Sequence, residues 1–429
     1  MDLVYVIMVL FLIFMTLRMP IAFAFGVSSL LYILAGHGSL VPIAQKVYGS
    51  LNSQGLLAVP FFILVGELMN RGGVAEKLID FVNAIMGHVR GGLAQVNVVV
   101  SIFEAGMSGV AASDIAAECV VLVPAMERAG YPRAFSAAVT AASSTMGPVI
   151  PPSVPMIIIA SMNELSVGRL FAAGFLPGLL MALFMAIYIA IIAPRRGFPR
   201  TKRPSLHQML KITVKAFPCL MAPVIILGGM ITGFATATEA GVIGVVYVFV
   251  IGKFLYKRIT LNEITGAITN TVNITAASMF IVAVAGLFGW ILTLEQFSTT
   301  LCNSIVQVIK SPYLLLFVLN VIMIIMGCFI NITTIIILLS PIVFPLIISY
   351  GIDPIHFGLL MVVNLMIGLL TPPVGMVTYL AVGITKCDYK EYLRELWPFM
   401  IALLCVLALI TYVPSIVLII PNLIYGPMG

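Results

Sequence analysis

Glycines and prolines recur in this sequence at positions that would interrupt a helix. Six matches share one offset of 221 residues: Gly106 with Gly327, Pro124 with Pro345, Gly130 with Gly351, Gly147 with Gly368, and Pro151-Pro152 with Pro372-Pro373. Proline lacks a backbone N–H, so each double proline frees helix carbonyls. In hydrocarbon such carbonyls must be buried in protein or line a polar cavity. The chemistry this favours is ion binding, with carbonyls facing a small cation and the next helix N-terminus facing an anion.

Polar side chains gather beside both interruptions. They are Ser108, Ser113, Asp114, Ser143, Ser144 and Thr145 in the first copy, and Asn331, Thr333, Thr334 and Asn364 in the second. A carboxylate in an apolar span is costly, so Asp114 is a functional candidate, with a structural capping role as the alternative. Oxygen groups with a single acid favour Na⁺ over a soft metal or a proton relay.

Membrane helices must position these groups. Of the 429 residues, 61% are hydrophobic and 9% charged, and the mean hydropathy of +1.17 excludes a water-soluble globular protein. The apolar tracts are long and continuous, which favours helices over an outer-membrane barrel. At roughly 20 residues a span, the chain has room for about a dozen. The sequence predicts an all-α polytopic membrane protein.

Basic residues predict the orientation. The loop 194–215 contains seven Lys and Arg residues and no acid, so we expect it in the cytoplasm. The loop at 253–258, two spans later, is also basic, which places 160–166 outside. Lys386, Lys390 and Arg394 place the end of the second copy inside. Equivalent points on opposite sides predict an inverted repeat, the arrangement used for alternating access.

Other classes of protein lack their signatures here. Six scattered cysteines without CxxC, four separated histidines without HExxH, and the absence of GxSxG or a P-loop argue against an enzyme or an ATP-driven pump. A channel is the remaining alternative, because broken helices also build pores. A two-fold repeat without a ring of acids disfavours it.

Three runs resemble one known family. They are GMSGVAASDIAAE at 106–118, AGYPRAFSAAVTAASSTMGPVIPPSVPM at 129–156 and YGIDPIHFGLLMVVNLMIGLLTPPVGM at 350–376. They are similar to the large membrane subunit of tripartite ATP-independent periplasmic (TRAP) transporters, and the resemblance extends over essentially the whole chain. Within that family the chain looks most like the sialic-acid branch.

The resemblance implies a sodium-coupled importer of the bacterial inner membrane. A domain with two re-entrant hairpins would slide against a scaffold, as in an elevator. The substrate would be an organic acid anion, with N-acetylneuraminate (sialic acid) preferred and a C4-dicarboxylate or another carboxylate as the alternative. The partners implied are a small four-helix membrane subunit, expected as a separate polypeptide, and a soluble periplasmic binding protein. No organic cofactor is implied.

The family's sodium sites map onto particular residues. These are Ser108, Asp114, Gly147, Val149 and Pro151 in the first copy, and Gly327, Asn331, Thr371 and Met376 in the second. Many relatives carry Asp where Asn331 stands, so the second site would carry less charge here. The anion would lie between the hairpin tips, near Ser144, Ser153 and Thr378.

The repeat and the resemblance together predict the division of the chain. We expect scaffold helices at 1–70, an amphipathic arm at 71–91, a first transport repeat with its hairpin at 92–167, scaffold helices with the basic loop at 168–297, a second arm at 298–312, a second transport repeat with its hairpin at 313–386, and a C-terminal helix at 387–429.

Overall fold

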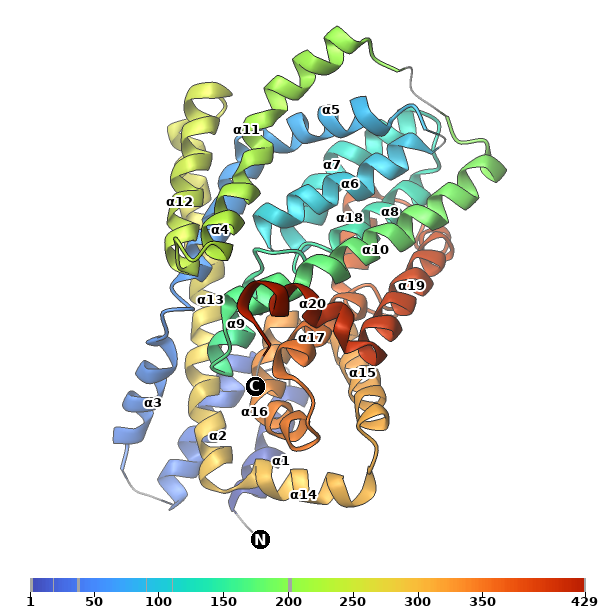
Figure 1. Ribbon diagram of the computed structural model, residues 1–429. Helices are drawn as coiled ribbons and strands as arrows, with labels where there is room; N and C mark the ends of the chain where they lie inside the picture. Colours follow the sequence, from blue (N-terminus) through green and yellow to red (C-terminus); the bar gives the residue numbers. More distant parts are fainter. Residues whose placement is uncertain are drawn as a thin grey trace.

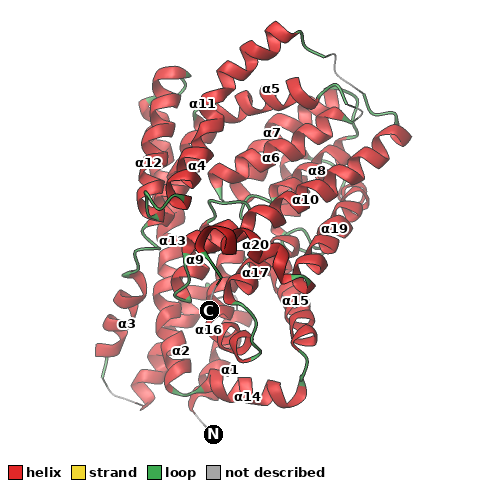
Figure 2. Cartoon of the chain, in the orientation of Figure 1, coloured by secondary structure: helices red, strands yellow, loops and turns green. Residues whose placement is uncertain are grey.

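The computed structural model describes residues 3–17, 19–36, 39–89, 91–109, 111–199 and 203–427, with every side chain in these ranges except those of residues 75, 107, 108, 112 and 113. All regular structure in this part of the chain is helical (Figure 2). Seven of its helices are long and apolar enough to cross a membrane, and six shorter ones of 10–17 residues are also apolar. The predicted all-α polytopic fold is confirmed.

One group of helices is joined to the long helix α13, either by direct packing or through one or two intervening helices. Its members are α1 (Leu3–Thr16), α2 (Ile21–Gly36), α3 (Val41–Leu51), α4 (Ala58–Arg71), α11 (Leu206–Ile231), α12 (Ala237–Val250, extended by a π-helical turn at Ile251–Leu255) and α13 (Leu261–Leu294). We call this group the scaffold.

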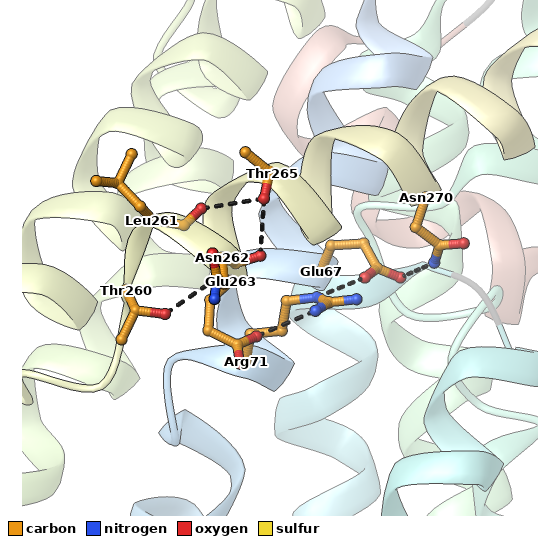
Figure 3. Close-up of polar contacts among 8 residues, drawn as sticks. All are labelled: Glu67, Arg71, Thr260, Leu261, Asn262, Glu263, Thr265 and Asn270. Atoms are coloured by element: carbon orange, nitrogen blue, oxygen red, sulfur yellow. Dashed lines mark hydrogen bonds and ion pairs between the residues drawn. The ribbon is translucent and has the colours of Figure 1, made fainter.

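A polar network joins α4 to the first turns of α13 (Figure 3). Arg71 contacts Glu263 at 3.0 Å and Glu67 at 3.3 Å. Asn270 donates to the other oxygen of Glu67 at 2.5 Å. The Arg71 guanidinium is therefore shared by the carboxylates of Glu263 and Glu67. Glu67 also accepts a hydrogen bond from the Asn270 amide, further along α13.

The second group contains the two copies of the repeat. The first copy is α6 (Gly92–Ser108), α7 (Ala111–Arg128), α8 (Arg133–Ser144) and α9 (Val154–Met162); the second is α15 (Pro312–Phe329), α16 (Ile332–Ser349), α17 (Pro354–Gly368) and α18 (Met376–Thr385). Helices α7 and α16 begin and end 221 residues apart. The offset seen in the glycines and prolines therefore extends to whole helices.

The copies exchange their last helices. The short helix α9 packs on α16 and α17 of the second copy, whereas α18 packs on α7 and α8 of the first. In Figure 1, α18 lies among α7 and α8 in the upper half, and α9 lies below them. The two copies thus form one interlocked body, which we call the repeat body.

Two expected boundaries differ in the structure. Helix α10 (Val167–Arg196), expected with the scaffold, packs on α6, α9 and α17. It also packs on α19 (Tyr389–Tyr412) and α20 (Pro414–Tyr425), and α19 lies against α8 and α17. These three helices therefore belong with the repeat body. The C-terminal region also contains two helices where one was expected.

Two amphipathic helices lie between the scaffold and the repeat body, and we call them the arms. Helix α5 (Val74–Met86) packs on α6 and on α11. Helix α14 (Phe297–Val308) packs on α16 and on α13. Each arm therefore touches both bodies.

Candidate functional site

The double prolines lie where crossing helices are interrupted. Helix α8 stops at Ser144 and α9 starts at Val154, while α17 stops at Gly368 and α18 starts at Met376. Both Pro–Pro peptide bonds are cis. The double prolines therefore interrupt a helix in each copy, as the sequence predicted. The hairpins are α6–α7 and α15–α16, and their turns lie beside the interruptions.

The first hairpin turn lies against the first interruption. Gly109 has a positive φ of 61°. A Cβ at Gly109 would lie 2.7 Å from the Pro152 carbonyl oxygen and 3.3 Å from the Ser153 Cα, so only glycine fits both its conformation and its space. The backbone of the turn and that of the unwound segment are therefore in direct contact.

Asp114 and Gly147, both predicted sodium ligands, are brought together. Asp114 is in the first turn of α7 and its side chain is buried. A Cβ at Gly147 would collide with Asp114 Oδ2. The carboxylate thus lies against the unwound backbone between α8 and α9.

The other predicted ligands of the first site point in different directions. The Pro151 carbonyl oxygen lies near Gly106 of α6, at 3.7 Å from where a Cβ would be. The Val149 carbonyl instead faces Gly174 of α10, where a Cβ would collide with it. Ser108 is the last residue of α6, and its side chain is outside the described part of the chain.

The second interruption is packed more closely and lacks an acid. A Cβ at Gly368 would lie 2.8 Å from the Gly327 Cα, so α15 and α17 touch backbone to backbone. The Thr371 hydroxyl donates to Ile367 O at 2.9 Å, and its carbonyl accepts from Cys328 Sγ at 3.0 Å. The position equivalent to Asp114 is Ile335, so this site has only neutral oxygen atoms to offer.

A cavity of about 360 Å³ lies between the two sites and helix α13 of the scaffold. Its walls come from both hairpins, both interrupted helices and one face of α13, and they consist of Gly109, Ala111, Pro148, Val154, Pro155, Ile274, Ala277, Ser278, Ile281, Asn331, Ile332, Thr333, Thr334, Met366, Leu369, Met376 and Val377. None of these described lining residues is charged. Asn331 and Met376, two of the predicted second-site ligands, therefore face the cavity.

Four helices start at this cavity. Its lining includes the first residues of α7 (Ala111), α9 (Val154), α16 (Ile332) and α18 (Met376). The N-terminus of a helix carries unsatisfied N–H groups and roughly half a positive charge. No charged side chain lines the cavity among the described residues, so the N–H groups at these helix starts are the groups available to an anion.

The three residues expected to contact the substrate do not line this cavity. The hydroxyls of Ser144, Ser153 and Thr378 are buried. They donate to the carbonyls of Ala141 at 3.0 Å, Pro148 at 2.5 Å and Leu370 at 2.9 Å, respectively. They fix the interruptions, and their contact with a substrate stays a prediction.

The hydroxyls that do line the cavity are Ser278, Thr333 and Thr334. The sequence predicted Thr333 and Thr334 as site residues, because they belong to the polar residues that follow Gly327. Ser278 is a lone serine in a 34-residue helix, and only the packing of α13 shows that it faces the site. Two further buried carboxylates, Glu104 and Glu118, also went unassigned. Glu118, one turn after Asp114, accepts from Ser101 at 2.6 Å.

Residues 8–416 match the family described as "Tripartite ATP-independent periplasmic transporter, DctM component". The C4-dicarboxylate TRAP transporter large permease protein DctM of Pseudomonas aeruginosa is 38% identical over 92% of this chain and 93% of its own length. The sialic acid TRAP transporter large permease protein SiaM of Vibrio cholerae is 34% identical over 95% of this chain and 96% of its own.

Solved structures with a similar fold are also transporters. The YdaH transporter of Alcanivorax borkumensis superposes with a TM-score of 0.61 at 16% identity, covering 88% of this chain and 89% of that one. At this identity the likeness shows the fold alone. The family match, in contrast, spans nearly the whole sequence and confirms both the resemblance and the inner-membrane location. The chain belongs to the DctM family, the large membrane subunit of TRAP transporters.

Proposed function

We propose that this chain is the transport subunit of a sodium-coupled importer of an organic acid anion. The observation that carries the proposal is the convergence of four helix N-termini on a cavity lined by no charged side chain among the described residues. Such a cavity attracts a carboxylate without the desolvation cost of burying a cationic side chain.

Sodium is the proposed coupling ion at the first site. The Asp114 carboxylate beside the unwound backbone at Gly147 offers the hard oxygen atoms that a small cation needs. The ion would supply a positive charge next to the cavity and hold the hairpin turn against the interrupted helix. Binding of ion and anion would then each strengthen the other by the same factor.

The proposed motion is a displacement of the repeat body along the scaffold. The cavity lies on the boundary between the two bodies, and both arms, α5 and α14, touch both of them. An anion bound there would travel with the repeat body. We further propose the family's two partners for this chain, a small membrane subunit and a periplasmic binding protein that delivers the anion.

The relatives leave two substrate classes to be distinguished. One relative is named for C4-dicarboxylates and another for sialic acid, at 38% and 34% identity. Our first choice is N-acetylneuraminate, because the motifs in the sequence look most like the sialic-acid branch. A C4-dicarboxylate is the second candidate, because the relative named for C4-dicarboxylates has the higher identity of the two.

Uptake into proteoliposomes tests the proposal. The chain and its small subunit are reconstituted, the binding protein is added outside, and labelled N-acetylneuraminate and succinate are compared with and without an inward sodium gradient. We expect accumulation of one anion only with the gradient. Equilibration without accumulation would contradict coupled transport and indicate a channel-like pathway.

A further inference from the structure

A second cavity lies away from the transport site, at the end of the molecule where α5 meets the first half of α11 (upper part of Figure 1). Its volume is about 500 Å³, and it is lined by Gly73, Lys77, Val214, Lys215, Pro218, Leu255, Tyr256 and Arg258. We call it the basic pocket. It lies between the arm α5 and the scaffold helices α11 and α12.

The charge of the basic pocket is strongly one-sided. Lys77, Lys215 and Arg258 line it, and none of its lining residues is acidic. Glu76 lies next to it and pairs with Arg258 at 3.3 Å, where both side chains are more than half exposed. One acid thus faces three bases, and neither lysine forms an ion pair with a carboxylate in the described part of the chain.

The remaining lining residues of the basic pocket are largely apolar, and some of them are exposed on the surface of the molecule. Val214 is 71% exposed and Leu255 is 56% exposed. Phe217, one turn after Val214, and Phe254, next to Leu255, are also more than half exposed. In a membrane protein such side chains face lipid. The pocket therefore combines a cationic centre with an apolar surround, as an amphiphilic anion requires.

The pocket is also held in shape. The Tyr256 hydroxyl donates to the Lys215 carbonyl at 2.9 Å and contacts Cys219 Sγ at 2.9 Å. This ties the turn after α12 to α11. The backbone that carries Lys215 is therefore fixed before any ligand arrives.

We propose that the basic pocket binds the phosphate of an acidic phospholipid. The location agrees with this, because the pocket is on the side of the basic loop 194–215, where a membrane presents anionic headgroups to cationic residues. A lipid there would fill the seam between arm and scaffold. Since α5 also packs on α6, occupancy would restrain the arm and alter the transport rate.

The test measures lipid retention by the full chain with its small subunit. The complex is purified into nanodiscs of phosphatidylcholine with or without phosphatidylglycerol of the same acyl chains, and bound lipid is counted by native mass spectrometry after detergent release. Lys215→Gln is compared with Lys211→Gln, one turn earlier on the same helix and outside the pocket.

We expect Lys215→Gln, and separately Lys77→Gln, to lower phosphatidylglycerol retention roughly fivefold each, with Lys211→Gln unchanged. Thermal unfolding in pure phosphatidylcholine checks that each variant is folded. The proposal is overturned if every variant retains as much phosphatidylglycerol as the unmodified chain. It is also overturned if the unmodified chain retains as much phosphatidylcholine as phosphatidylglycerol. Inorganic phosphate is added in a separate arm; displacement of the lipid at millimolar phosphate would assign the pocket to a soluble phosphate and also overturn it.

Discussion

Asp114 and Gly147 form the chemical centre of the first site. The carboxylate lies so close to the glycine that even a methyl group does not fit between them. This contact joins the hairpin α6–α7 to the interrupted helix α8–α9 through one residue on each. Any ligand of the carboxylate therefore also meets the unwound backbone.

Removing the carboxylate should change the sodium dependence of transport. For Asp114→Ala we expect uptake to be impaired more at low sodium than at high sodium, because mass action offsets a weakened ion site. The measurement is initial uptake rate against sodium concentration in proteoliposomes. An equal reduction at every sodium concentration would show that Asp114 is not a ligand.

Adding a single methyl group opposite the carboxylate should have a similar effect. In Gly147→Ala the new Cβ collides with Asp114 Oδ2 and displaces the carboxylate. Loss of a charge-assisted contact predicts an increase of about tenfold in the sodium concentration for half-maximal uptake. Gly383→Ala in α18 is the matched control, since nothing lies within 4 Å of its added Cβ. A normal sodium dependence in Gly147→Ala would disprove the arrangement.

At the scale of elements, each copy ties its first helix to its third just before the interruption. Ser143 of α8 donates to Asn97 of α6 at 2.8 Å. At the equivalent position in the second copy, Asn364 of α17 donates to Asn320 of α15 at 2.9 Å. Both links lie one helical turn before the matched glycines, so the interruption starts from a fixed helix end.

The link in the second copy continues to α19, where Asn320 donates to Thr411 at 3.0 Å. Asn364→Leu keeps the side-chain size but leaves the Asn320 carbonyl oxygen without this donor. Interhelical hydrogen bonds in membranes contribute about 0.6–1.7 kcal/mol, so we expect a fall of a few degrees in the unfolding midpoint. Differential scanning fluorimetry measures it. Asn422→Leu, at an exposed position of α20, should leave the midpoint unchanged; equal shifts in both variants would refute the link.

The helices and the repeat could be predicted from the sequence because Gly and Pro act locally on the backbone. Their common offset is also the offset of α7 from α16. Side-chain direction could not be predicted. Spacing placed Ser144 beside the interruption, yet its hydroxyl turns back to Ala141, and Ser278 faces the cavity only because α13 packs there. The position of α10 was missed for the same reason: an apolar helix does not reveal which body covers it.

At the scale of the whole molecule, the scaffold and the repeat body meet along α13 and α4. The scaffold contributes α13 itself, and the repeat body contributes α16, α9 and the hairpin turns that enclose the cavity. Two arms bridge the bodies on separate sides. The motion proposed above would require the repeat body to slide along this boundary.

A cross-link between the bodies should stop transport if they slide. A Cβ at Gly289 of α13 would lie 3.6 Å from the Pro341 Cβ of α16, a separation suited to a disulfide. With the native cysteines replaced, oxidised Gly289→Cys/Pro341→Cys should lose uptake and regain it on reduction. In Gly229→Cys/Ala235→Cys, where the two Cβ atoms would lie 3.5 Å apart within the scaffold, uptake should be kept when the pair is oxidised. Full activity in the first, fully cross-linked pair would exclude a sliding motion at this contact.

The exchange of α9 and α18 between the copies has a consequence for biosynthesis. Helix α9 ends at Met162, but α16, on which it packs, begins about 170 residues later at Ile332. At about 5–20 residues per second, the ribosome takes roughly 10–30 s to make that stretch. During this interval α9 is in the nascent chain without α16 and α17, two of the helices on which it packs. The first copy is therefore completed only when the second has been synthesised, and a chain that terminates early leaves both copies unfinished.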